Sequence, residues 1–181
     1  MVTSSDIERA LDLYCDRFPR RMSTVADLRA LIRRGVSVTS RRDFQGHVTC
    51  GALVLDEHGK VLAIHHRVLR RWLMPGGHLE IFDSTLASAA SRELSEELGI
   101  PPNEILFPKQ WNDVPVDIDR HTIPENLAKS EPMHEHWDFR FLMAVSGKIG
   151  RLQLDEVSGA AWVDPDKLSD KLAAIISEVR R

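Results

Sequence analysis

Three glutamates within five residues are the part of this sequence best suited to chemistry. Glu93, Glu96 and Glu97 are spaced as i, i+3 and i+4, so in a helix they share one face. Like charges at this spacing repel each other, and the last turn of a helix favours cations. A divalent cation would compensate, because Mg²⁺ binds carboxylate oxygens together with phosphate oxygens. The pattern predicts a metal site, with a solvated acidic face as the alternative.

Two adjacent glycines precede this helix, which we expect from Ser84 to Leu98. Gly76 and Gly77 follow the expected strand WLMP. Glycine permits positive φ and a close approach of the backbone to a ligand or ion. Such a pair is common in plain turns, but its place just before a helix that carries carboxylates favours the metal site.

The stretch from Gly77 to Ile100, GHLEIFDSTLASAASRELSEELGI, resembles the signature box of the Nudix hydrolases. That box reads G-x5-E-x7-R-E-U-x-E-E-x-G-U, where U is aliphatic. The second half, from Arg92 to Ile100, matches at every fixed position. The first half departs, because Asp83 replaces the first Glu and one extra residue separates it from Arg92.

The resemblance implies an α/β (α+β) fold, an α/β/α sandwich with a mixed sheet. It also implies Mg²⁺- or Mn²⁺-dependent hydrolysis of a diphosphate linkage, by attack of water on phosphorus, in a nucleoside diphosphate derivative or related compound. Carried over residue by residue, the implied metal ligands are Gly77 through its carbonyl, Glu93, Glu96 and Glu97. Arg92 would hold a box carboxylate through charge-assisted hydrogen bonds. Glu93 is the first candidate for the base, and Glu156, just before the last expected strand, is the second.

An alternating run, His134 to Phe141, supplies the predicted substrate contacts. In a strand, His134, His136, Asp138 and Arg140 lie on one face, and three aromatic residues lie on the other. We expect His136, Asp138 and Arg140 to line the substrate site, with Arg140 on a phosphate and His78 beside it. A solvated sheet face, or a second metal held by His134, His136 and Asp138, are the alternatives.

Helices at the start, middle and end frame these residues. Residues 1–45 predict an N-terminal helical hairpin, capped first at Ser5 and then at Ser23 or Thr24. Residues 46–179 form the predicted Nudix domain, which opens with a hairpin of two β-rich runs and closes with a helix after Pro165. For the N-terminal extension the sequence leaves two roles open, a homodimer contact or a cover over the site.

Composition limits the functions that remain. The chain has 181 residues, 28% of them charged, with a net charge of −3. These values argue against binding to a nucleic acid polymer or a membrane and favour a cytoplasmic protein with a small-molecule diphosphate substrate. Two cysteines exclude a disulfide scaffold. They leave open an isopentenyl diphosphate isomerase-like enzyme that uses Cys50, and a non-catalytic nucleotide sensor on the same fold is a further alternative.

Overall fold

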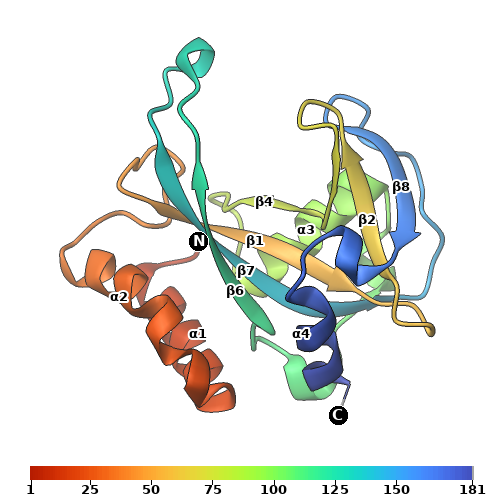
Figure 1. The fold of residues 1–181 in the computed structure, drawn as a ribbon, viewed down its shortest axis with the longest axis horizontal. Helices are drawn as coiled ribbons and strands as arrows, with labels where there is room; N and C mark the ends of the chain where they lie inside the picture. The colour runs from red at the N-terminus through yellow and green to blue at the C-terminus, as the bar shows by residue number, and fades with distance from the viewer. Residues whose placement is uncertain (181) are drawn as a thin grey trace.

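A five-stranded mixed sheet lies at the centre of the fold, which the computed structural model describes for residues 1–180. Its order is β4-β1-β7-β5, and β6 pairs with β7 as well. β1 and β7 run parallel, and the other pairs are antiparallel (Figure 1). The strands are β1 (His47–Val54), β4 (Gly76–His78), β5 (Ile105–Leu106), β6 (Asp117–Ile123) and β7 (His134–Val145).

A second, antiparallel sheet stands beside the first, in the order β3-β2-β8. It consists of β2 (Val61–His66), β3 (Arg71–Leu73) and β8 (Val157–Val163). The predicted hairpin between the first two strands is therefore wrong, because β1 and β2 belong to different sheets and share only the bridge between Leu55 and Val61. The chain leaves the first sheet directly after β1.

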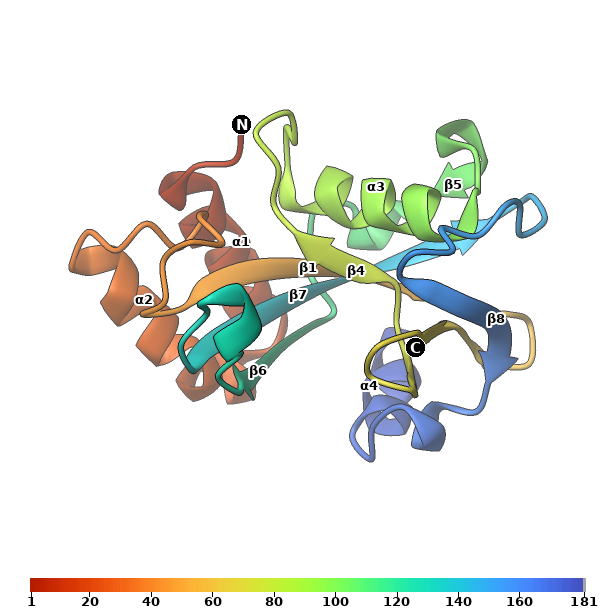
Figure 2. The same ribbon diagram turned by 90° about the horizontal axis from the view of Figure 1, so that it is seen from above.

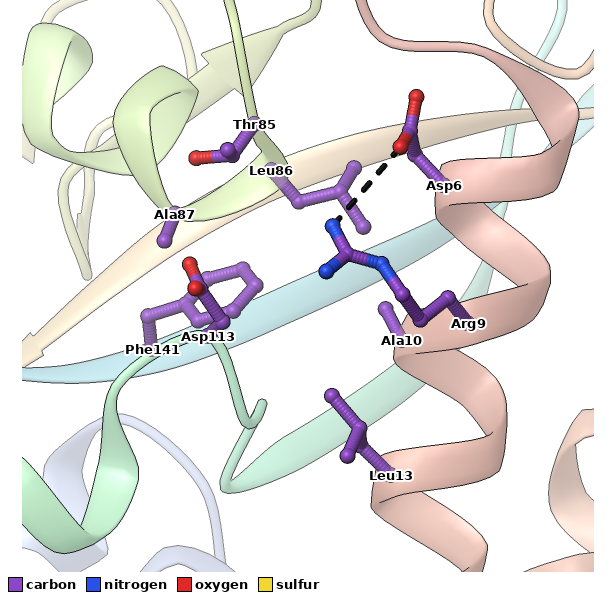
Figure 3. A pocket seen from close by; sticks show the side chains of 9 residues that line it. All are labelled: Asp6, Arg9, Ala10, Leu13, Thr85, Leu86, Ala87, Asp113 and Phe141. Atoms are coloured by element: carbon purple, nitrogen blue, oxygen red, sulfur yellow. Dashed lines mark ion pairs between the residues drawn. The ribbon is translucent and has the colours of Figure 1, made fainter.

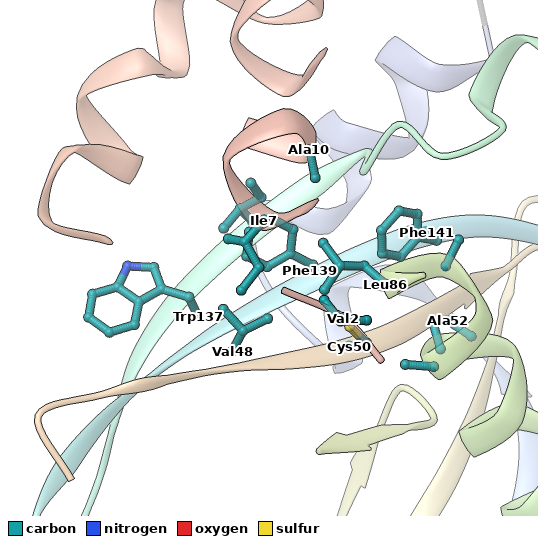
Figure 4. Packing of buried hydrophobic residues seen from close by; sticks show 14 of the residues in the cluster. Val2, Ile7, Ala10, Val48, Cys50, Ala52, Leu86, Trp137, Phe139 and Phe141 are labelled. Atoms are coloured by element: carbon teal, nitrogen blue, oxygen red, sulfur yellow. The ribbon is translucent and has the colours of Figure 1, made fainter. Parts of the chain in front are cut away.

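Four α-helices cover the two faces of the central sheet: α1 (Ser4–Arg17), α2 (Ala26–Arg33), α3 (Leu86–Leu98) and α4 (Leu172–Val179). Figures 1 and 2 show α3 and α4 on opposite sides of β1 and β7. On the side of α1, α2 and α3 the core is built on every second strand residue, including Cys50, Trp137 and Phe139 (Figure 4). This arrangement confirms the predicted α/β sandwich with a mixed sheet.

The N-terminal helices belong to the same core as the rest of the chain. Ile7 and Leu11 of α1 are fully buried in the cluster that contains Phe139. α1 begins earlier than predicted, because Thr3 is its N-cap and forms a capping box with Asp6. The start of the second helix also differs, since a 3₁₀ turn, η1 (Pro19–Val25), precedes α2 and no side chain caps it.

The helix α1 and the first turn of α3 lie side by side above the sheet. Figure 3 shows the pocket between them, which Phe141 also lines, and the ion pair of two lining residues of α1, Asp6 and Arg9. This pocket lies away from the glutamates. No helix among residues 1–180 is long and apolar enough to cross a membrane.

Candidate active site

The helix α3 is fixed at both ends, which sets the direction of its glutamates. Thr85 and Ser88 form a capping box at its start, and Gly99, with φ of 60°, ends it. At its C-terminal end the backbone N–H of Gly150 donates to the backbone carbonyl of Leu98 (2.9 Å), and the backbone N–H of Gln153 donates to the backbone carbonyl of Glu97 (3.1 Å). These contacts bind the segment before β8 to the last turn of α3.

Arg92 holds the carboxylates of the box together. Its Nη1 donates to Glu93 Oε1 (3.0 Å) and to Glu96 Oε2 (2.9 Å), and its Nη2 donates to the carbonyl of His78 (2.9 Å). Burial opposes the charged form of Arg92, but its hydrogen bonds to Asp83 and the charge of Glu93 outweigh it and raise the pKa. The guanidinium is therefore permanently charged and fully engaged.

Asp83 has a definite role despite its departure from the box pattern. It is 3% exposed and pairs with Arg92 in a bidentate geometry, with distances of 3.0 Å and 3.1 Å. It also accepts the backbone N–H of Glu80 at 2.7 Å, which closes the loop before α3. The shorter acid on the longer loop therefore orients Arg92, and its carboxylate is occupied by protein donors.

Glu93 and Glu97 are two carboxylates in one small region, and Glu97 is buried while the side chain of Glu93 is 15% exposed. Burial is the main cause that raises the pKa of both, and for Glu97 the charge of Glu93 raises it further, to about 8. Glu97 is 2% exposed and accepts the backbone N–H of Gly76 at 3.1 Å. Glu96 is exposed and turned to Arg92. Protein donors thus hold these side chains: the guanidinium of Arg92 binds Glu93 and Glu96, and the backbone N–H of Gly76 binds Glu97.

Gly77 lies directly against Glu93. A Cβ atom at this position would stand 2.5 Å from Oε1 of Glu93, so no other residue fits without displacing the carboxylate. The close approach predicted from the glycine pair is present, but the turn is not. Gly76 and Gly77 form the strand β4 with ordinary backbone angles, because they pair with Gly51 and Cys50 of β1.

Glu156 comes to the same region from another part of the chain. It is exposed at the start of β8, and its charge contributes to the raised pKa values of Glu93 and Glu97. The hydrogen bonds between Gln153 and α3 keep this segment beside the helix. The structure therefore brings together the box glutamates, Gly77 and Glu156, as the sequence predicts.

Two of the predicted substrate residues of β7, Asp138 and Arg140, are hydrogen-bonded to other side chains of the protein. Arg140 is 8% exposed and bonded to Asp138 (3.0 Å), Asp117 (2.9 Å) and Asp119 (3.0 Å). Asp138 also accepts from Thr49 at 3.1 Å. The geometry thus gives Arg140 and Asp138 a role in the protein interior, and it does not fit the predicted phosphate contact, because carboxylates already occupy the guanidinium.

His78 and His136 lie close to each other on the face of the central sheet opposite α3. His78 is paired in register with Thr49, next to Gly77, and its ring lies 5.2 Å from that of His136. Burial lowers the pKa of His78 to about 3 and that of His136 to about 2, so both rings are neutral at pH 7. A neutral imidazole can donate one hydrogen bond to a substrate or accept one from it. Their predicted role in substrate binding stays a prediction.

Cys50 does not suit the isomerase alternative. Its side chain is fully buried on the core face of β1, where burial raises the pKa of the thiol well above its ordinary value (Figure 4). A thiol in that place reaches no substrate. Sequence reasoning also missed His47, which is 1% exposed and lies opposite His136 in the register of β1 and β7. Its signal was the alternation of β1, in which residues 47 and 49 are polar.

The sandwich and the clustered carboxylates together define a protein of the Nudix class. A family model described as NUDIX domain matches residues 46–180, and the chain belongs to this family. The finding confirms the resemblance seen in the box.

Two curated relatives share part of the chain. One is a probable DHNTP pyrophosphohydrolase of Lactococcus lactis subsp. cremoris, 36% identical over 105 residues, which are 58% of this chain and 58% of that protein. The other is phosphatase NudJ of Escherichia coli K12, 42% identical over 72 residues, which are 38% of this chain and 46% of that protein. The matches thus span about half the length of these relatives.

Solved structures share the fold. A MutT NUDIX hydrolase from Burkholderia pseudomallei superposes with a TM-score of 0.52 at 21% identity, covering 75% of this chain and 98% of that one. The dihydroneopterin triphosphate pyrophosphohydrolase of Escherichia coli gives 0.53 at 17% identity, covering 72% and 92%. At these identities the likeness concerns the fold alone.

Proposed function

We propose that this chain is a hydrolase that uses Mg²⁺ or Mn²⁺ to cleave a diphosphate linkage in a nucleoside diphosphate derivative or a related small molecule. The observation that carries the proposal is the pair of carboxylates next to Gly77, with Glu97 buried and the side chain of Glu93 15% exposed. Burying two like charges is costly unless a cation compensates them. A divalent cation fits this oxygen-rich set and would supply charge neutralisation for the phosphate oxygens.

The residues of the chain would divide the work as follows. Glu97, Glu96 and Glu93 would hold the cation, with the carbonyl of Gly77, and Arg92 would keep Glu93 in place. Glu93 would take the proton of the attacking water, with Glu156 as the second candidate. The water oxygen bonds to phosphorus, the bond from phosphorus to the bridging oxygen breaks, and the leaving phosphate departs with that oxygen.

The name of one relative supports this class of reaction. The Lactococcus protein is described as a probable DHNTP pyrophosphohydrolase. We propose the same bond type for this chain and leave the leaving group open, because residues outside the box select it. The cytoplasm is the compartment we expect, on composition alone.

A panel of diphosphate compounds tests the proposal. We expect phosphate or nucleotide release that requires Mg²⁺ or Mn²⁺ and falls about a hundredfold or more in Glu93→Gln. Glu97→Gln should require more metal for the same rate. Glu57→Gln is the matched control, because its side chain is 86% exposed in the turn after β1. Full activity of Glu93→Gln, or binding of a nucleotide without turnover, would contradict the proposal, and the second result would favour a sensor.

A further inference from the structure

The side chains of three histidines converge on the face of the central sheet opposite α3, away from the glutamates. His47 begins β1, and His134 and His136 begin β7. One ring nitrogen of each can be chosen so that all three lie within 4.8 Å of one another. All three side chains are at least nine-tenths buried, with exposed fractions of 1%, 7% and 9%.

The proton positions of two of these rings follow from their backbone partners. Nδ1 of His47 lies 3.1 Å from the carbonyl of Asp43, and Nδ1 of His134 lies 2.7 Å from the carbonyl of Pro132. A carbonyl only accepts, so both Nδ1 atoms carry the hydrogen. In the neutral rings Nε2 therefore carries the lone pair, and that of His134 lies at hydrogen-bond distance (3.1 Å) from Nε2 of His136. Metal-binding histidines are commonly oriented in this way by a carbonyl on the other nitrogen.

The lone pair of His47 has no partner. Its Nε2 is buried and makes no hydrogen bond within residues 1–180. Leaving a buried polar atom unpaired costs about 1–3 kcal/mol, so such an atom needs an explanation. Two other imidazole rings lie close to the ring of His47. The distance between ring centroids is 4.4 Å to His136 and 5.0 Å to His134.

The spacing of the other two nitrogens suits one metal ion. Nε2 of His134 and Nε2 of His136 are 3.1 Å apart. Two nitrogens bound to one tetrahedral Zn²⁺ at about 2.0–2.1 Å stand roughly 3.3 Å from each other. A ring nitrogen of the third residue, His47, lies within 4.8 Å of a ring nitrogen on each of these two.

We propose that His47, His134 and His136 form a binding site for a divalent transition metal of the zinc class. Three imidazole nitrogens favour such ions over Mg²⁺, which prefers oxygen ligands. The oxygen ligand that the sequence pattern suggested, Asp138, is taken by Thr49 and Arg140. Three protein ligands leave one tetrahedral position open. The ring of His78 lies 5.2 Å from those of His47 and His136, on the side of the box.

Cobalt provides a test that does not depend on catalysis. The full chain is stripped with a chelator and titrated with Co²⁺ in a large excess of Mg²⁺, which occupies oxygen sites. We expect one equivalent of Co²⁺ with a visible absorption of nitrogen ligation, displaced by Zn²⁺. His134→Ala should weaken Co²⁺ binding by on the order of a hundredfold, and His47→Ala should do the same.

Two controls separate this site from the glutamates and from surface histidines. His58→Ala should bind as the unchanged chain does, because its side chain is 74% exposed. Glu97→Gln should also keep the cobalt signal, so the site can stand even where the proposed hydrolysis fails. If His47→Ala does not fold, the Co²⁺ affinity of His134→Ala tests the proposal, because His134 is the first residue of β7.

Thermal unfolding gives a second reading. Zn²⁺ should raise the melting temperature of the unchanged chain, because it binds only the folded state, and should leave His134→Ala unaffected. No Co²⁺ binding in excess Mg²⁺, or equal binding to His134→Ala and to the unchanged chain, would overturn the proposal. The first result would instead leave the rings as neutral contacts for a substrate.

Discussion

At Gly77 the missing side chain is what allows Glu93 to reach the strand. A Cβ atom there would lie between 2.5 Å and 2.8 Å from the three atoms of the Glu93 carboxylate. Because Arg92 and the core hold α3 firmly, the carboxylate and not the helix would have to move. The identity of this residue therefore controls the position of a proposed base.

We predict that Gly77→Ala lowers turnover about a hundredfold, the typical cost when a catalytic group shifts by about 1 Å. The free energy of unfolding should change much less. Gly159→Ala in β8 is the matched control, because its Cβ would meet only the Cβ of His65, at 4.0 Å. Steady-state rates on the best substrate of the panel measure the effect, and equal activity of both variants would refute the role of Gly77.

Glu97 gives the metal-free protein a specific dependence on pH. Its pKa is about 8, raised first by burial and then by the charges of Glu93, Glu156 and Glu96, against the hydrogen bond from Gly76. The unfolded value is about 4.3. Between these values the folded state binds more protons than the unfolded state, so the free energy of unfolding falls as pH rises.

In a chelator we therefore expect stability to drop from about pH 5 to about pH 8, by on the order of a few kcal/mol. Glu97→Gln should flatten this decline, and Glu57→Gln, with its exposed side chain, should not. Urea unfolding at a series of pH values measures the slope. A decline of equal steepness in Glu97→Gln would show that Glu97 titrates normally.

The residues of the box could be found from sequence because their spacing is local. Glu93, Glu96 and Glu97 share a helix face whatever the fold. The partner of Arg92 could not be found in this way, since Asp83 departs from the pattern and pairs through a loop. The partners of Arg140 could not be found for a related reason. A strand pattern shows which face a residue occupies, but not that carboxylates of a neighbouring strand will enclose it.

At the scale of elements, β6 and β7 are joined by charges as well as by backbone pairing. The guanidinium of Arg140 is enclosed by Asp117, Asp119 and Asp138. Nearby, Arg120 pairs with Glu135 but is 45% exposed. The same two strands thus contain one buried and one exposed ion pair. The two pairs are expected to contribute differently to the free energy of unfolding.

We predict that Arg140→Met lowers the free energy of unfolding by about 3–5 kcal/mol, because it takes the buried cation from the three aspartates that enclose it. Two of them, Asp117 and Asp119, keep the half-exposed Lys171, and Asp117 also keeps the more distant Arg21. Arg120→Met should cost about 1 kcal/mol or less, since water replaces the lost contact. Chemical denaturation of both variants measures the difference. Equal losses would show that the buried cluster does not depend on Arg140.

The sequence predicted which segments form strands better than it predicted which strands pair with each other. The alternation in β7 correctly placed Trp137 and Phe139 in the core, because a strand sends alternate residues to opposite faces. The β1–β2 hairpin failed, since a turn signal between two β-rich runs does not show which sheet the second run joins. β1 instead pairs with β7, more than eighty residues away, a contact that no local pattern contains.

At the scale of the whole molecule, the N-terminal helices close the core. Ile7 and Leu11 of α1 pack in one cluster with Trp137, Phe139 and Phe141 of β7 (Figure 4). Removing them would expose this apolar face of the sheet to water. Residues 1–45 therefore share one hydrophobic core with the Nudix domain, and we predict that the two unfold as one cooperative unit. A cover over the site and a homodimer both stay predictions.

Two leucines of α1 test this cooperativity. Leu11 is fully buried, and Leu13, on the same helix, is 37% exposed. We predict that Leu11→Ala lowers the free energy of unfolding by about 2–5 kcal/mol, because it loses buried surface and leaves a cavity. Leu13→Ala should cost much less.

The decisive reading is the number of unfolding transitions. If α1 and the sheet share one core, Leu11→Ala lowers the midpoint of a single transition, and probes in α1 and near Trp137 report the same temperature. Tryptophan fluorescence and far-ultraviolet circular dichroism supply the two probes. An early loss of helix with an unchanged fluorescence midpoint would show that α1 folds separately. In that case the chain would consist of a Nudix domain with a docked, independent extension, and the catalytic variants could be studied without residues 1–45.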